Sequence, residues 1–215
     1  MRRAPALLLA LGLALAPAAA AQPDRVSLVV RLAPGREVTG ARRVRVTVRD
    51  LLADPRWAQA LDQSFPIRLS FRLEIWRSRA GLDELQRATE WSEVVQREPL
   101  EDQFRVTQIL LSGPVEHRYA TRDELSRALG TTSEVDALPT GAGTFYYTVR
   151  LRITALSDED MEELERFLAG DPNSPAGPEG GSIGRSIRRL LLKIAGLPSQ
   201  ELEARSEEFR IGSPR

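Results

Sequence analysis

The feature that most constrains this chain is an alternation of apolar and polar residues through two long segments. Within residues 67–76, IRLSFRLEIW, every second side chain is apolar, and residues 145–154, FYYTVRLRIT, repeat the pattern. Successive side chains of a strand point to opposite faces, so each segment predicts a strand with one buried and one solvated face. Such strands are typical of antiparallel sheets.

Shorter segments complete the prediction of an α+β fold. Further strands are predicted where the alternation continues, over residues 26–32, 44–49, 104–111 and 115–119. Short helices are predicted to begin at the capping residues Asp54, Thr121 and Ser157. Residues 80–100 are ambiguous: their first half fits a brief helix, and their second half looks extended before Pro99. Residues 131–143 predict a loop. We expect a mainly antiparallel sheet with the short helices packed on one face.

Residues 1–21 have the layout of a secretory signal peptide. Arg2 and Arg3 precede an apolar run over residues 4–16, and small residues surround a predicted cleavage after Ala21. The run is too short for a comfortable membrane span, and no second run approaches the roughly 18 apolar residues that a span requires. We therefore expect a periplasmic or secreted protein with no transmembrane span in its mature form. An uncleaved N-terminal anchor is the alternative.

The charge balance and the absence of cysteine limit the kinds of partner and the kinds of cross-link that this chain can have. The chain has 30 basic and 30 acidic side chains, and removal of the leader takes away two arginines. The slightly negative balance argues against non-specific nucleic-acid binding, which needs an excess of positive charge. The chain has no cysteine, so packing and hydrogen bonds must stabilise it without disulfides.

The composition divides the mature chain into three parts. We expect a domain over residues 22–169, a flexible linker over 170–182, rich in Gly and Pro, and a C-terminal amphipathic helix and tail over 183–215. The predicted helix carries an apolar stripe at helical spacing, made by Ile183, Ile187, Leu190, Leu191 and Ile194. Cations lie beside the stripe, at Arg185, Arg188, Arg189 and Lys193. Such a helix either packs on the domain or docks on an anionic membrane surface or an envelope protein. In the tail, Phe209 and Ile211 are possible anchors.

Arginines recur on the polar side of the two long strands. Arg68, Arg72, Arg150 and Arg152 are predicted to share one sheet face. They could form a basic floor for an anionic ligand, or pair with carboxylates such as Glu74 on a solvated face. We favour the solvated face.

The sequence offers little catalytic chemistry. It has no H-E-x-x-H metal motif and no phosphate-binding glycine loop, and its only histidine, His117, lacks a second His or a Cys to share a metal. We expect no metal site, no cofactor and no catalytic residue. Carboxylates stay open as acid/base groups, since glycoside cleavage needs only two of them.

One segment resembles a known family. The stretch FPIRLSFRLEIWRSRAGLDELQRATEWSEVVQREPLEDQFRV, with its aromatic Trp91, and the later HRYATRDELSRALG are similar to the domain-of-unknown-function family 4390. The resemblance covers about residues 26–155 and implies an exported bacterial envelope protein without known activity. It supplies no site residues.

The hypothesis that follows is an exported, non-catalytic envelope protein that acts by binding. Two alternatives remain: a periplasmic carrier of an apolar or anionic ligand held on a curved sheet, and a carboxylate-dependent hydrolase of envelope glycans. The sequence does not indicate the partner or the oligomeric state.

Overall fold

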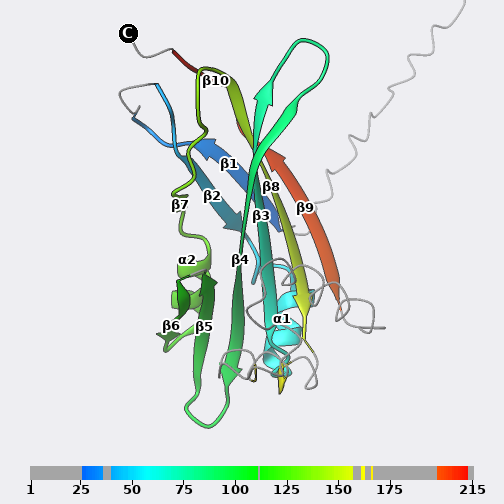
Figure 1. Cartoon of the computed structure of the whole chain (residues 1–215). Coiled ribbons are helices and arrows are strands. Elements are labelled where there is room, and N and C mark those ends of the chain that lie inside the picture. Colours follow the sequence, from blue (N-terminus) through cyan, green and yellow to red (C-terminus); the bar gives the residue numbers. More distant parts are fainter. Residues whose placement is uncertain are drawn as a thin grey trace, which may run out of the picture.

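The computed structural model describes residues 26–35, 40–110, 112–156, 161, 162, 166 and 198–212. These residues form two antiparallel sheets that share one hydrophobic core (Figure 1). The main sheet has the strand order β10-β8-β3-β4-β5-β6, with β9 also paired to β8, and the small sheet has the order β1-β2-β7. The strands are β1 (Ser27–Leu32), β2 (Val44–Arg49), β3 (Ile67–Ser78), β4 (Glu84–Glu98), β5 (Gln103–Leu110), β6 (Gly113–Tyr119), β7 (Ser133–Val135), β8 (Gly143–Ala155), β9 (Ser199–Arg205) and β10 (Phe209–Ile211).

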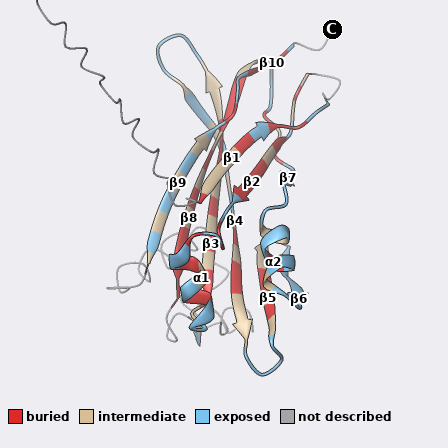
Figure 2. Ribbon diagram, turned by 180° about the vertical axis from the view of Figure 1, so that it is seen from behind, coloured by how far each residue is buried: buried red, intermediate tan, exposed pale blue. Residues whose placement is uncertain are grey.

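The two alternating segments form the centre of the main sheet. β3 and β8 pair along their whole length, with Ile67 opposite Ala155 at one end and Ser78 opposite Thr144 at the other. The alternating apolar side chains of both strands lie on the inner face, where they are buried (Figure 2): Ile67, Leu69, Phe71, Leu73, Ile75, Phe145, Tyr147, Val149, Leu151 and Ile153. The prediction from alternation is confirmed here.

The small sheet covers part of this inner face. Its strands β1 and β2 contribute Val30, Leu32, Val44 and Val46 to the same core as β3 and β8. The loops around it are fixed by Tyr147, whose hydroxyl lies 2.7 Å from the carbonyl oxygen of Arg42 and 2.9 Å from that of Ala137. The sequence predicts the strands but not their separation into a second sheet, because alternation specifies a face and not a pairing partner.

Two helices pack into the same core, as predicted from their caps. In α1 (Pro55–Asp62), Asp54 accepts a hydrogen bond from the backbone N–H of Arg56, and the buried side presents Trp57 and Leu61. In α2 (Arg122–Leu129), Thr121 and Glu124 form a reciprocal capping box. No helix among the described residues is both long enough and apolar enough to cross a membrane. Of the third predicted helix, residues 161, 162 and 166 are described and are helical, and Met161 packs against Val94 and Leu156.

Two segments differ from their expectation. Residues 84–98, which fit either structure in the sequence, form the 15-residue strand β4, and the predicted loop 131–143 contains β7. β4 carries its apolar residues on both faces, because Val94 belongs to a small cluster on the outer face while Val95 joins the main core. The alternation of apolar and polar residues is therefore lost near the end of β4.

The residues after 198 also differ, because they belong to the sheet and not to an appended tail. β9 pairs with β8 from Thr148 to Thr154, and β10 pairs with β8 from Gly143 to Phe145. Phe209 stacks on Tyr147 at 5.5 Å between ring centroids, which confirms the predicted anchor. The sequence does not predict this pairing because the alternate positions Glu201, Glu203 and Arg205 of β9 are charged. Such charges suit an edge strand but resemble those of a polar tail.

Candidate functional site

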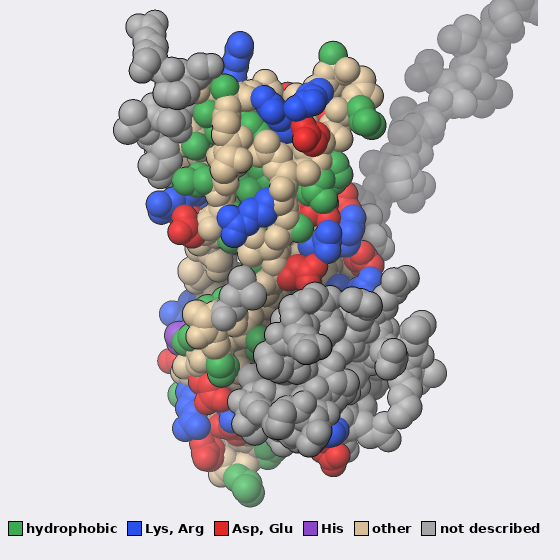
Figure 3. All heavy atoms as spheres, in the orientation of Figure 1, with side chains coloured by type: hydrophobic (Ala, Val, Ile, Leu, Met, Phe, Trp, Pro, Cys, Tyr) green, Lys and Arg blue, Asp and Glu red, His purple; other side chains and the backbone are tan. Residues whose placement is uncertain are grey.

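The four arginines of the predicted basic sheet face do lie on one face of the main sheet. In the register of β3 and β8, Arg72 is opposite Arg150, Ser70 is opposite Arg152, and Arg68 is opposite Thr154. This is the outer face, directed away from the small sheet, where basic and acidic side chains lie next to each other (Figure 3). The structure thus brings the predicted arginines together.

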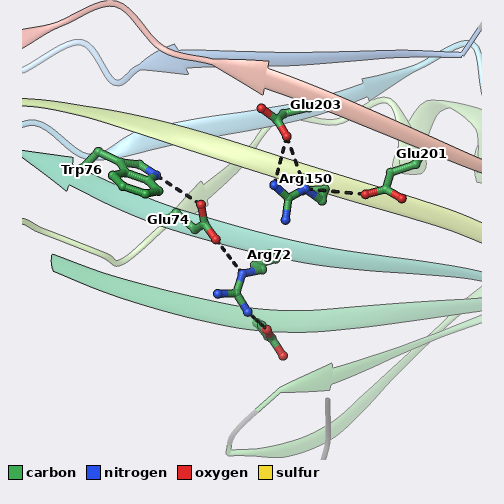
Figure 4. Close-up of polar contacts among 7 residues, drawn as sticks. Arg72, Glu74, Trp76, Arg150, Glu201 and Glu203 are labelled. Carbon is green, nitrogen blue, oxygen red and sulfur yellow. Dashed lines mark hydrogen bonds and ion pairs between the residues drawn. The ribbon is translucent and has the colours of Figure 1, made fainter. Parts of the chain in front are cut away.

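Carboxylates of β3 and of neighbouring strands pair with Arg72 and Arg150 (Figure 4). Arg72 lies 2.7 Å from carboxylate oxygens of both Glu74 and Glu90, and the hydrogen bond to Glu74 is the main reason that the pKa of Arg72 is raised. Glu74 is 9% exposed and also accepts a hydrogen bond from the indole of Trp76 at 3.1 Å.

The arginines of β8 are paired in the same way by β9. Arg150 lies 3.2 Å from Glu203 and 3.6 Å from Glu201, and Arg152 lies 3.2 Å from Glu201. Arg68 donates to the hydroxyl of Ser92 at 3.3 Å. The face therefore carries alternating charges, as the solvated-face interpretation expects, rather than an excess of positive charge for an anion.

An aromatic cluster continues the outer face toward the β3–β4 hairpin. The rings of Trp76 and Tyr146 stack at 6.5 Å, and the guanidinium of Arg205 lies 3.5 Å from the centre of the Tyr146 ring. The Tyr146 hydroxyl donates to Asp83 at 2.7 Å, which lowers the pKa of that carboxyl. The pKa of Tyr146 is raised, first by burial and then by this same hydrogen bond. These contacts connect the hairpin turn, β8 and the end of β9.

The inner face holds a different kind of site. A crevice opens where β4 meets the small sheet and α2, and it is lined by Val46, Val48, Leu69, Phe71, Trp91, Glu93, Leu129, Thr131 and Ser133. Glu93 is the single carboxylate of this lining. Its Oε1 accepts a hydrogen bond from the Gln108 side chain at 3.2 Å. Burial raises the pKa of the Glu93 carboxyl, while the Gln108 hydrogen bond and the attraction of His117 act in the opposite direction.

The size and lining of the crevice bear on the alternative functions. It encloses about 20 Å³, room for about one water molecule, so a carrier role would require the two sheets to separate. A glycosidase needs two carboxylates about 5–9.5 Å apart across its cleft, and this lining provides one. No group of three or more His, Cys, Asp or Glu side chains that could hold a metal occurs among the described residues.

Sequence reasoning did not single out Glu93. The sequence does place Trp91, Glu93 and Val95 at alternate positions of a segment that looks extended, so the three side chains are expected on one face of a strand. An acidic residue on the apolar side of a strand is the exception that such a pattern reveals. His117 lies on β6 and is exposed.

Other predicted residues lie outside the described part of the chain. These are the cleavage site at Ala21 and the whole candidate docking helix: Ile183, Arg185, Ile187, Arg188, Arg189, Leu190, Leu191, Lys193 and Ile194. Residues 180–184, GGSIG, also lie there and match the G-x-S-x-G spacing of a serine nucleophile, so an expectation that the chain lacks this motif is wrong. The motif requires a preceding strand, and the Gly- and Pro-rich sequence before it shows no strand pattern.

Comparison with known proteins identifies no relative: no protein-family model, no curated protein and no solved structure matches this chain.

Proposed function

We propose that this protein is an exported, non-catalytic component of the bacterial envelope that acts by binding, and that its docking element is the amphipathic segment 183–194. The leader-like residues 1–21 support the location. The binding role rests on where the amphipathic segment is inserted.

The observation that carries the proposal is that residues 157–197 connect two paired neighbours in one sheet. Thr154 and Ser199 are opposite each other in β8 and β9, and the backbone N–H of Ala155 donates to the carbonyl oxygen of Pro198 at 3.2 Å. The segment is therefore an insertion fixed at both ends, not a C-terminal appendage. It has roughly 40 residues, whereas hairpin loops usually have two to five, and loops longer than about 15 residues are usually functional or disordered.

The composition of the insertion supports docking by an amphipathic helix. Its apolar stripe and four cations have the arrangement of helices that lie on anionic membrane surfaces. The charges of the insertion are separated along the sequence: its eight acidic residues lie between residues 158 and 179, whereas residues 183–194 carry four cations and no carboxylate.

Vesicle flotation tests the proposal. The mature protein should float with vesicles that contain anionic phospholipid and should float less with neutral vesicles or at high salt, because surface attraction is screened. Replacing Arg188 and Arg189 by Gln, or Ile187 and Leu191 by Ser, should abolish flotation. The matched control, Arg150→Gln with Arg152→Gln, removes the same charge from the sheet face and should float normally.

An envelope protein as partner would give a different result. Flotation would then be absent for every variant, while cross-linking in envelope extracts would capture a partner with the unmodified protein and not with the Ile187→Ser, Leu191→Ser variant. Equal capture or flotation by all variants would refute the assignment of segment 183–194 as the docking element.

A further inference from the structure

Glu93 differs from the other partly buried carboxylates of the main sheet. Glu74 and Glu98 each lie within salt-bridge distance of an arginine, at 2.7 Å from Arg72 and 3.0 Å from Arg105. Glu93 has no salt bridge within the described part of the chain, and its hydrogen-bond donor there is the neutral amide of Gln108. The attraction of His117 does not outweigh the effect of burial on the Glu93 carboxyl. Because a carboxylate removed from water without a salt bridge is costly, its position among apolar side chains needs an explanation.

The crevice lining brings together hydrogen-bond acceptors from different elements. Glu93 comes from β4 of the main sheet, and the hydroxyl groups of Thr131 and Ser133 come from the end of α2 and from β7. The Thr131 hydroxyl donates its proton to the carbonyl oxygen of Arg127 at 2.9 Å, so toward a ligand it can act only as an acceptor. Acceptors gathered around an acidic group suit a ligand that carries several donors and a positive charge.

The size of the crevice distinguishes between cations. The enclosed part of the crevice has room for about one water molecule, which suits a compact ammonium head with three donors better than a planar guanidinium. The apolar remainder of the lining, including Trp91 stacked on Phe71 at 4.8 Å, suits the alkyl stem that bears the ammonium.

The surface around the crevice is accessible. On the same side of the sheet as Gln108 lie Leu110 and Val115, which are 38% and 42% exposed. Because Gln108 lies between Glu93 and Val115 in the register, an alkyl stem that leaves the crevice in this direction would lie on apolar side chains.

We infer that the crevice around Glu93 is a binding site for a primary ammonium group on an alkyl stem, as in a lysine side chain of a partner protein, with Glu93 as the counter-ion. The ammonium displaces one water and donates to Glu93, Thr131 and Ser133. This site is separate from the insertion between β8 and β9 and does not depend on the function proposed for that segment.

Nuclear magnetic resonance of the full mature chain tests the inference with n-butylammonium chloride as the probe. The Trp91 indole and Gln108 side-chain amide signals should shift saturably, while the Trp57 and Trp76 indoles stay in place. n-Butylguanidinium and tetramethylammonium at equal ionic strength should shift neither set saturably. A peptide containing one lysine should compete with n-butylammonium for the site, whereas the same peptide with acetylated lysine should not.

The deciding variant is Glu93→Gln, which keeps the shape of the side chain and removes the charge. Its affinity for n-butylammonium should fall at least about tenfold, in line with the loss of a charged hydrogen bond. The control Glu90→Gln changes the same residue type on the opposite face of β4 and should bind normally. Unchanged affinity in Glu93→Gln, or equal binding of the guanidinium, would overturn the inference. A melting temperature of the variant no lower than that of the unmodified protein would show that any loss of binding is not due to unfolding.

Discussion

Phe209 provides the most informative test of the fold, because it lies in the segment that the sequence assigned to a tail. Its side chain is 8% exposed, stacks on Tyr147 at 5.5 Å and lies 6.2 Å from the ring of Phe145. If β10 completes the main sheet, Phe209→Ala removes a buried ring from the core. If the segment were a polar appendage, the substitution would have no effect on unfolding.

The magnitude follows from this environment. Replacing a buried phenylalanine by alanine typically costs about 3–5 kcal/mol, and the stacking on an aromatic neighbour is worth about 0.5–1.5 kcal/mol of that. β10 has three residues and lies at an edge, so its neighbours can partly close the cavity. We therefore expect a loss of about 3 kcal/mol, which lowers the melting temperature by about 10 °C in a domain of this size.

Urea unfolding followed by circular dichroism measures this loss. The matched control is Arg210→Ala, the next residue along β10, whose side chain is exposed and should leave the midpoint within about 0.5 kcal/mol. Equal midpoints for Phe209→Ala and the unmodified protein would refute the assignment of β10 to the core.

Three further substitutions test single contacts by urea unfolding. Glu93→Gln should raise the free energy of unfolding at pH 7, because burial raises the pKa of the Glu93 carboxyl in the folded state. This gain in stability should be complete above the folded-state pKa and should vanish below about pH 4. A loss of stability at pH 7 would contradict the prediction. Asp54→Ala should cost about 1–2 kcal/mol of stability at pH 7, because it removes the α1 cap and the Arg56 contact. The pKa of Asp54 is lowered, mainly by Arg56, so this cost should shrink as the pH falls below about 4. A cost that stays constant with pH would be inconsistent with this. Tyr147→Phe should cost about 1–2 kcal/mol, since it leaves two loop carbonyls without their donor, and no change would show that the loops are held otherwise.

The elements that the sequence predicts are those whose signal is local. Alternation in residues 67–76 and 145–154 identifies the two central strands, and the caps at Asp54 and Thr121 identify the helix starts. Each of these signals depends on side chains within a few residues of one another.

The features that the sequence misses depend on partners far apart in the chain. The three-residue strand β7 is too short for any period and exists because it pairs with β2. β9 and β10 form because β8 offers a free edge, about 50 residues or more away in the chain. The crevice at Glu93 arises only when β4 faces α2 and β7, so a local pattern could identify the unusual acid but not its surroundings.

The central claim is that residues 170–196 contain the docking element and that the two-sheet frame is stable without them. The most direct test is to replace residues 170–196 by a flexible Gly/Ser linker and to measure, for the same variant, its melting temperature and its retention in washed bacterial envelopes. The account predicts an unchanged melting temperature together with lost retention. Full retention combined with a collapsed melting temperature would contradict it, and would show that the insertion packs on the domain as part of its core.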